Sequence, residues 1–384
     1  MYQSKWPYYT DEMKKNVLNI LSSGKVNQWT GSKVFEFEKK FSEYFGVEHS
    51  IAVFNGSVAL ELCLKTLEIG IGDEVIVTPR TFIASASSIS LLGATPVFVD
   101  VDHSQNITLE NIIKAKTNKT RAVILVHLAG WPCDLEEIVS WCHDNNINVI
   151  EDCAQAHGAK YKNKFIGTWG DINAWSFCQD KIISTGGEGG MVTTNNKNLY
   201  LKAWSYKDHG KNMEKIFSSK SEPGIFKWVH DSIGTNLRMT EIQASIGIDS
   251  LNHLDDWVTS RRKNAFIFNK ILGDLNVVYI PTPNEKYYHV YYKYYIFINK
   301  EYLREEYNVK NIIIDINNSG IPCFQGTCGE VYKEKAFDLN IDLPVTKNLT
   351  ERSIMFLVDP SFKEEIIQEI ATKVRQILLK YQIE

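Results

Sequence analysis

Lys181 lies in the stretch WSFCQDKIISTGGEGGMVTTN, residues 175–195, between a short apolar run and a turn that contains four glycines. A lysine amine can be a solvated surface cation, or it can hold a carbonyl cofactor as a Schiff base. The phosphate-binding GxxxxGK[ST] loop is excluded because this lysine precedes the glycines. Taken alone, this stretch does not decide whether Lys181 is a surface cation or a covalent anchor for a cofactor.

A second polar cluster follows the apolar run INVI, in the stretch EDCAQAHGA of residues 151–159. Glu151 and Asp152 stand at the end of a predicted strand, and Gln155 and His157 come just beyond. An aspartate in this position could bind a metal, a ribose or a protonated ring nitrogen. The neighbouring side chains form no convincing set of metal ligands, so we expect no metal site.

Two further turns after apolar runs carry residues that suit a ligand. Asn55 and Gly56 form a turn in NGSVALELCL, and Ser57 could cap the helix that begins there. Free backbone N–H groups at such a helix start bind phosphate, although an ordinary capped turn gives the same pattern. Phe82, in RTFIAS, could stack on a flat ligand or pack into the core.

The elements that must position these residues alternate along the first two-thirds of the chain. Seven runs rich in Val and Ile are nearly continuous in apolar character, which is typical of strands covered on both faces of a mostly parallel sheet. Helical patterns lie between them, so the sequence predicts an α/β fold. In such sheets ligands bind beyond the carboxyl ends of the strands. The predicted strands cover residues 50–55, 73–79, 94–102, 121–130, 147–154, 172–177 and 189–195.

The pattern changes near residue 240, where residues 239–272 predict a long amphipathic helix that is broken or bent. Tyrosine-rich strands follow in YYHVYYKYYIFIN, and the chain closes with a helix in KEEIIQEIATKVRQILLKYQ. We therefore expect a large α/β domain over residues 26–245 and a smaller α+β domain over residues 246–384. Residues 1–25 are mostly helical in pattern and are expected to pack with the smaller domain.

Composition excludes several classes of protein. The net charge of −4 over 384 residues gives no broad basic surface for nucleic acid. No apolar run resembles a secretory signal or reaches the length of a membrane span, and no cysteine belongs to a CxxC pair. Buried, reduced thiols fit a cytoplasmic protein. Cys323 and Cys328 make only a weak zinc signal.

As a set, the candidate residues match the needs of pyridoxal 5′-phosphate (PLP). Its aldehyde requires a lysine, its ring nitrogen a carboxylate, its ring face an aromatic partner and its phosphate a helix start. The stretches NGSVAL, TFIAS, EDCAQAHGA, WSFCQDKIISTGGEGG and GTNLRMTEIQASIG, in this order, resemble the DegT/DnrJ/EryC1/StrS family of PLP-dependent sugar aminotransferases. The resemblance spans about residues 30 to 260 and implies fold type I with a seven-stranded, mostly parallel sheet.

The resemblance also implies residue roles. Lys181 would form the Schiff base and move the proton between the substrate Cα and C4′ of the cofactor. Asp152 would pair with the ring nitrogen, Gln155 with the phenolic oxygen, and Phe82 would stack on the ring. Asn236 would reach the phosphate of the neighbouring subunit's cofactor, which makes a homodimer necessary for activity. The expected phosphate ligands within the chain are Gly56, Ser57 and Ser176.

The implied reaction moves an amino group from L-glutamate to a nucleotide-activated keto sugar for surface polysaccharides, with pyridoxamine 5′-phosphate between the half-reactions. Relatives with histidine in place of this lysine act as dehydratases, so Lys181 favours transamination. Residues 324–328, FQGTC, depart from the sugar-pocket pattern of many relatives, which keeps a small phosphorylated ketone open as acceptor. A non-catalytic PLP-binding regulator is a further alternative. Candidate substrate contacts are Arg238, His289, Lys207 and His209, of which the last three could equally be ordinary loop or strand residues.

Overall fold

The computed structural model describes residues 2–217, 228–327 and 329–383 of the chain. All seven predicted strands of the first two-thirds are present, and they join in one seven-stranded sheet. The strand order across this sheet is β1-β9-β8-β5-β4-β2-β3. The strands are β1 (His49–Val53), β2 (Glu74–Val77), β3 (Thr95–Phe98), β4 (Thr120–Val126), β5 (Asn148–Asp152), β8 (Ile172–Ser176) and β9 (Gly190–Thr194).

The sheet is mostly parallel, as predicted. β3, β2, β4, β5 and β8 pair in parallel, whereas β9 is antiparallel to both of its neighbours, β8 and β1. The register places Asp152 of β5 opposite Val126 of β4 and Ala174 of β8. The carboxyl ends of β1, β2, β4, β5 and β8 consequently meet at one edge of the sheet, where the candidate residues lie.

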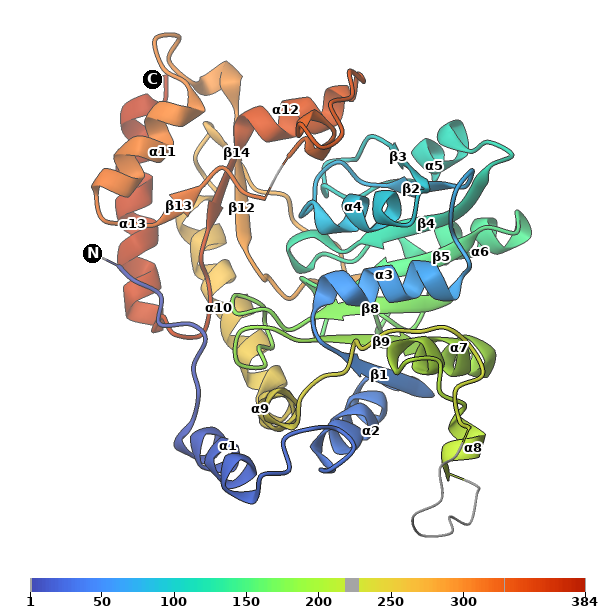
Figure 1. Cartoon of the computed structure of the whole chain (residues 1–384). Helices are drawn as coiled ribbons and strands as arrows, with labels where there is room; N and C mark the ends of the chain where they lie inside the picture. The colour runs from blue at the N-terminus through green and yellow to red at the C-terminus, as the bar shows by residue number, and fades with distance from the viewer. Residues whose placement is uncertain (1, 218–227, 328, 384) are drawn as a thin grey trace.

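Helices cover both faces of the sheet, which explains the continuous apolar strands. In β4, Ala122 and Ile124 pack with one helical layer, and Val123 and Leu125 pack with the other. The first layer contains α3 (Gly56–Thr66), α4 (Ala84–Leu91) and α7 (Lys197–Lys207), and the second contains α2 (Lys33–Phe45), α6 (Leu135–Asp144) and α9 (Glu241–Asn252) (Figure 1). The shorter helices of this part are α5 (Leu109–Ala115) and α8 (Met213–Phe217).

The smaller domain is α+β, as expected, and lies beside the sheet domain on the left of Figure 1. Its antiparallel sheet has the order β10-β12-β14-β13. The strands are β10 (Val278–Tyr279), β12 (Tyr294–Ile298), β13 (Cys323–Phe324) and β14 (Ser353–Phe356). The helices are α10 (Leu254–Leu272), α11 (Val309–Asn318), α12 (Pro344–Arg352) and α13 (Glu364–Tyr381).

The predicted long helix near residue 240 is indeed broken, at His253 between α9 and α10. Ala244, Ile248 and Leu251 of α9 belong to the core of the large sheet, whereas the core of the smaller domain begins at Ala265 of α10. The expected domain boundary at residues 245/246 therefore falls inside α9, and the change of core takes place along α10.

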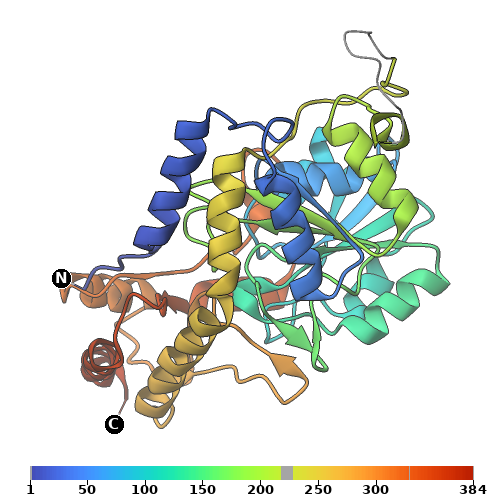
Figure 2. The same ribbon diagram turned by 90° about the horizontal axis from the view of Figure 1, so that it is seen from below.

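The amino-terminal segment touches both domains. The backbone N–H of Tyr2 donates to the carbonyl oxygen of Gly320 at 2.9 Å, and Ser4 Oγ donates to Asp359 at 2.8 Å, so the first residues run along the smaller domain. Helix α1 (Asp11–Ser23) instead packs against α9, and Figure 2 shows the two helices side by side. Residues 1–25 were expected to pack with the smaller domain, and they divide between the two.

Two features join the domains away from the candidate residues. A small sheet pairs β11 (Tyr287–Tyr288) with β6 (Lys160–Tyr161), which in turn pairs with β7 (Lys164–Phe165). Asp100, beyond β3, accepts hydrogen bonds from the backbone N–H groups of Val345 and Thr346 at 2.9 and 2.8 Å, at the start of α12. A carboxylate from the large domain thus caps a helix of the smaller one.

The thiols lie inside the fold. Cys63, Cys133, Cys142, Cys153 and Cys323 are buried and free, Cys178 is partly exposed, and Cys328 lies outside the described residues. Within the described part of the chain, no helix combines the length and the apolar character needed to cross a membrane.

Candidate active site

A cavity of about 640 Å³ opens where the carboxyl edge of the large sheet faces the smaller domain. Its walls come from the segments that follow β1, β2, β5 and β8, together with β12, β13 and β14. The cavity collects seven of the residues that were predicted to hold the cofactor, from four separate stretches of sequence. These are Gly56, Ser57, Phe82, Asp152, Gln155, Ser176 and Lys181.

The start of α3 forms one wall. Asn55, not Ser57, is the N-cap, because the Asn55 side chain accepts a hydrogen bond from the Val58 N–H at 3.0 Å. Ser57 lies in the first turn and lines the cavity. A Cβ atom on Gly56 would stand 2.5 Å from Ser176 Cβ, so only glycine lets the helix start approach β8 this closely. First-turn N–H groups of a helix, together with a hydroxyl such as that of Ser176, can bind an anion, so the predicted phosphate ligands lie side by side in the lining.

Asp152 lies on the floor of the cavity at the end of β5. One of its oxygens accepts a hydrogen bond from Ser85 Oγ at 2.8 Å, and the other accepts one from the Ala154 N–H at 3.1 Å. Burial raises the pKa of Asp152, while Ser85 and the charge of Lys181 pull it down. A cationic ring nitrogen placed against this carboxylate would favour its ionised form, which is the partner that PLP requires.

Gln155 is oriented by the backbone. Its Oε1 atom accepts a hydrogen bond from the Ala129 N–H at 2.8 Å, which leaves the amide nitrogen as the donor on the cavity side. A donor of this kind suits the phenolic oxygen of the cofactor. The cavity position of Gln155 therefore agrees with its expected role, which stays a prediction.

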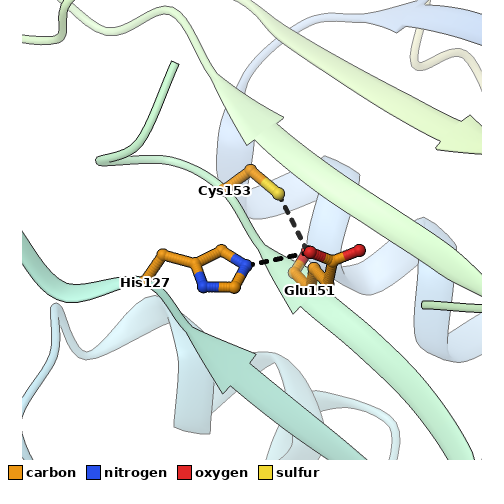
Figure 3. Close-up of side chains that lie close together, drawn as sticks. All are labelled: His127, Glu151 and Cys153. Atoms are coloured by element: carbon orange, nitrogen blue, oxygen red, sulfur yellow. Dashed lines mark hydrogen bonds and ion pairs between the residues drawn. The ribbon is translucent and has the colours of Figure 1, made fainter. Parts of the chain in front are cut away.

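Glu151, the neighbour of Asp152 in β5, lies close to His127 and Cys153 (Figure 3). Glu151 accepts from the backbone N–H groups of Gly167, Trp169 and Gly170, each at 2.8 Å, and its fourth partner is His127 Nε2 at 3.0 Å. His127 Nδ1 accepts from the Cys133 N–H, so Nε2 carries the proton. Burial opposes ionisation of Glu151, but His127 and the backbone donors hold its pKa below the usual value.

These bonds use all four acceptor sites of the Glu151 carboxylate. The cluster therefore acts as internal bracing for β5. The backbone N–H of His127 also donates to the carbonyl oxygen of Asp152 at 3.2 Å, and this bond fixes the backbone of Asp152. A metal ion would have to displace these bonds.

Lys181 lies in the loop between β8 and β9. Its Nζ is 3.2 Å from the hydroxyl of Tyr292 and 3.7 Å from Asp180 Oδ1, and its side chain is 14% exposed. The Tyr292 hydroxyl donates to the other oxygen of Asp180. Burial opposes ionisation of Asp180, but Lys181, Tyr292 and Lys293 hold its pKa below the usual value. The amine is thus partly buried, held in place and open to the cavity, unlike a surface cation.

The glycines after Lys181 shape its loop. Gly186 and Gly187 have φ angles of 88° and 123°, which favour glycine over residues with a Cβ. The Gln179 N–H donates to the Gly187 carbonyl oxygen at 3.0 Å and closes the loop ahead of β9. The sequence interpretation of a tight turn that leads into the next strand is confirmed.

Phe82 stands at the rim of the cavity with 62% of its surface exposed, a high value for so large an apolar side chain. Phe82 belongs to none of the core clusters formed by the described residues, so the core alternative for this residue is excluded. An exposed ring beside a cavity gains most by stacking on a flat ligand.

The other predicted residues lie elsewhere in the chain. Asn236 and His209 are exposed and outside the cavity lining, and the side chain of Arg238 forms an ion pair with Asp208. Lys207 is fully buried, with Nζ 3.4 Å from both Gln28 and Glu38. Contact of Lys207 with a substrate would require breaking this pair inside the core.

His289 is also buried. Its ring stacks on Tyr291 at a centroid distance of 3.9 Å, and Nδ1 accepts from the Tyr291 N–H at 2.9 Å. Burial lowers the pKa of His289 to about 3, so the ring is neutral at physiological pH. This geometry matches the alternative of a strand histidine with satisfied contacts, and the cavity lining does not include it.

Sequence reasoning missed several polar residues of the cavity, among them Ser85, Asp180, Tyr292 and Lys293. Ser85 and Asp180 stand inside or beside motifs that were singled out, in TFIAS and CQDK, so their proximity was a usable clue. Tyr292 and Lys293 reach the cavity from the start of β12, and only the packing of the two domains brings them there.

Comparison with known proteins agrees with this geometry. The GDP-perosamine synthase of Escherichia coli O157:H7 is 37% identical over 92% of this chain and 95% of that protein. The dTDP-3-amino-3,6-dideoxy-alpha-D-galactopyranose transaminase of Aneurinibacillus thermoaerophilus is 31% identical over 96% of each. The crystal structure of an aminotransferase from Psychrobacter cryohalolentis superposes with a TM-score of 0.96 at 44% identity, over 98% of this chain and 99% of that one.

The model of the DegT/DnrJ/EryC1/StrS aminotransferase family matches residues 7–375, almost the whole chain. The expected family, fold type I and cofactor are thereby confirmed. The chain belongs to the DegT/DnrJ/EryC1/StrS aminotransferase family and is a PLP-dependent transaminase.

Proposed function

We propose that this enzyme moves the amino group of L-glutamate to the keto group of a nucleotide-activated sugar, as a step in the synthesis of a surface polysaccharide. The observation that carries the proposal is the cavity, in which Lys181, Asp152 and the predicted phosphate ligands Gly56 and Ser176 converge on one ligand-sized space. Relatives whose names specify GDP-linked and dTDP-linked sugars support the substrate class.

The residues divide the work of holding the cofactor. Asp152 would keep the ring nitrogen protonated, Gln155 would donate to the phenolic oxygen, and Phe82 would cover one face of the ring. Gly56, Ser57 and Ser176 would bind the phosphate. When bound, PLP supplies the electron sink that lets the bond at the donor Cα break heterolytically.

Lys181 then has two tasks, one covalent and one in proton transfer. Its Nζ would anchor the cofactor between turnovers, and after release it would take the proton from Cα of the amino donor and deliver it to C4′ of the cofactor. Tyr292 and Asp180 hold the amine within reach during this transfer. In the second half-reaction the same amine moves the proton back toward the former keto carbon of the sugar.

The acceptor side of the cavity includes the run that departs from the family pattern. Phe324, Gly326 and Thr327 line the same cavity as Phe82, and Gly326 has a φ angle of 123°. This arrangement leaves room for a sugar beside the cofactor. The names of the two relatives specify sugars linked to different nucleotides, GDP and dTDP. We therefore propose a class of substrate, the keto sugar nucleotides, without specifying the base.

We further propose that the active form is a cytoplasmic homodimer. Asn236 is exposed on a segment that runs beside β1, and Ile233 and Trp228 near it are 92% and 85% exposed. Apolar surface of this kind favours a protein partner. In the dimer, Asn236 would reach the cofactor phosphate of the partner subunit, and Arg238 and His209, on neighbouring segments, would face its substrate. The burial of Lys207 and His289 gives their proposed substrate roles no support within one chain.

The test is spectroscopic. The protein loaded with PLP should be yellow, and L-glutamate should bleach the visible band in a single turnover. A panel of keto sugar nucleotides and small phosphorylated ketones, added to the bleached enzyme, should restore the band only with the true acceptor. Lys181→Ala should abolish both changes by removing the covalent anchor and the proton carrier, a loss of at least about 100-fold.

A colourless protein that gains no band with PLP would refute the proposal. Recovery with a small phosphoketone and not with any sugar nucleotide would favour the alternative acceptor. Bound cofactor with no bleaching by any amino acid would favour a regulator over an enzyme.

A further inference from the structure

A second, smaller cavity of about 170 Å³ lies behind the wall of the first. The two cavities share Asp180, Tyr292, Lys293 and Leu357 as lining residues. The rest of its lining comes from the amino-terminal segment, through Ser4 and Trp6, and from Arg261, Val358 and Asp359. A nucleotide sugar is too large for this space, whereas a short acidic side chain fits it.

The cation in the shared wall is Lys293. Its side chain is 16% exposed, and Nζ lies 4.6 Å from the centre of the Tyr292 ring and 3.7 Å from Asp180 Oδ2. Asp180 Oδ2 already accepts from the Tyr292 hydroxyl, and Asp180 also pairs with Lys181. Among the described residues no hydrogen bond to Lys293 Nζ is formed, so its three donors are available to an anion.

A second cation lies deeper. Arg261 is 1% exposed, and its Nη1 donates to the Tyr292 carbonyl oxygen at 3.1 Å. Its Nε and Nη2 atoms are buried and have no hydrogen-bond partner among the described residues. The Trp6 ring lies 5.0 Å from the guanidinium carbon. The Arg261 guanidinium thus adds positive charge beside Lys293, and two of its nitrogen atoms still have no hydrogen-bond acceptor among the described residues.

The acidic groups around this cavity are already satisfied. Asp359 accepts from Ser4 Oγ at 2.8 Å, from Ser361 Oγ at 2.5 Å and from the Ser361 N–H at 3.1 Å. Asp180 is shared by Lys181, Tyr292 and Lys293. Around this cavity, Lys293 and Arg261 therefore have hydrogen-bond donors without a partner in the described part of the chain, whereas most carboxylate oxygens are already occupied. Such a site suits a carboxylate ligand.

We propose that the smaller cavity binds the side-chain carboxylate of a dicarboxylic amino donor, with Lys293 as the residue that selects it. This inference rests on the proposed function. The Nζ atoms of Lys181 and Lys293 each form an ion pair with one of the two carboxylate oxygens of Asp180. They also lie 4.7 and 4.6 Å from the centre of the Tyr292 ring. A donor whose amine is at Lys181 can therefore extend its side chain toward Lys293.

The arrangement also separates the two substrates. Both must react at the same carbon of the cofactor in turn, so a shared anchor would hold one of them poorly. A carboxylate site behind the shared wall recognises the small donor and leaves the large cavity to the sugar nucleotide. Lys293 thereby acts as a specificity-determining residue for the first half-reaction.

The experiment compares glutamate with alanine, which lacks the side-chain carboxylate. In single-turnover bleaching of the PLP-loaded enzyme, Lys293→Met should raise the half-saturating glutamate concentration by about 10- to 100-fold and change that for alanine less than about threefold. Lys293→Arg should retain part of the preference for glutamate because it keeps the charge. Lys300→Met, at an exposed lysine that pairs with Glu351 outside both cavities, is the matched control.

A binding measurement separates this inference from the reaction itself. Glutarate has two carboxylates and no amine, so calorimetric titration of the PLP-loaded enzyme with glutarate should show at least about tenfold weaker binding to Lys293→Met than to the unaltered protein. Equal glutarate affinity, or an equal loss for glutamate and alanine, would overturn the inference. If glutamate fails to bleach the unaltered enzyme, the proposed function fails, and the glutarate titration still decides the role of Lys293. Thermal melting of each variant verifies that it is folded.

Discussion

Asp152, Lys181 and Lys293 show how single charges in the cavity are set by their immediate neighbours. Asp152 is buried with two neutral donors and, among the described residues, has no cation in contact, which is the environment that a protonated ring nitrogen would complete. Lys181 and Lys293 share Asp180, so neither amine has a carboxylate to itself. The incompletely paired charges are those of Asp152, which would face the cofactor, and of Lys293, which would face an anionic donor.

The pH dependence of donor binding follows from Lys293. Burial lowers the pKa of Lys293 to about 8, although Asp180 and Asp359 oppose the shift, while Arg261 and Lys181 add to it. Below this pH the ammonium group is present and binds a carboxylate; above it the charge is lost, so affinity falls as pH rises. We expect the half-saturating glutamate concentration, relative to that of alanine, to increase by up to about tenfold per pH unit above 8.

Taking the ratio to alanine cancels every titration that both donors share, including that of their amino groups. In Lys293→Met the ratio should be independent of pH between 7 and 9. A ratio that rises equally in the variant would assign the dependence to another group.

At the scale of elements, the loop between β8 and β9 depends on glycine backbone conformations that other residues rarely adopt. A Cβ on Gly187 would meet no atom within 4 Å, so the conformation, with φ of 123°, is the sole obstacle to a side chain. The same loop carries Lys181 and Asp180. Its shape and the position of the reactive amine are therefore linked.

Gly187→Ala should destabilise the protein by about 1–3 kcal/mol, the cost of holding a residue with a Cβ in a sparsely populated region. Urea unfolding followed by circular dichroism measures the loss. Gly70→Ala is the matched control, since its φ is not positive and its added Cβ would approach only the Leu92 carbonyl oxygen, at 3.9 Å. Equal effects of both substitutions would show that loop strain is not the cause.

Elements of the large domain could be predicted because their information is local. The seven strands are short apolar runs with clear ends, and in a parallel sheet those ends gather polar residues such as Asp152 and Ser176 at one edge. Lys293 could not be found this way, because it enters the cavity only when the smaller domain packs on the sheet. Lys207 and His289 show the opposite case: both are buried polar residues, and their partners are the buried Glu38 and the partly buried Tyr291.

At the scale of the whole molecule, the exposed segment around Asn236 is the part that a single chain leaves unexplained. It is hydrogen-bonded to the strand that begins the large sheet and presents apolar side chains to solvent. A second copy related by twofold symmetry would cover this surface and complete the phosphate site.

Complementation between inactive variants tests this arrangement. Lys181→Ala and Asn236→Ala should each be inactive or nearly so, but co-expression should restore about one quarter of the full activity. Half of the dimers are then mixed, and each mixed dimer has one intact site made from both chains. Lys181→Ala with Asp152→Ala should restore nothing, since both residues act within one chain. Failure of the first pair to recover activity would mean that Asn236 serves its own subunit.

The carboxylate of Asp100, which caps α12 from across the domain boundary, has a thermodynamic consequence for the whole chain. Together with the pairing of β11 with β6, it ties the melting of the smaller domain to that of the larger one. Two domains joined only by a flexible linker melt independently, whereas here loss of one removes hydrogen-bond partners from the other. Heat capacity measured through unfolding should therefore pass through one peak, so that a partly melted enzyme with an intact cofactor site never accumulates.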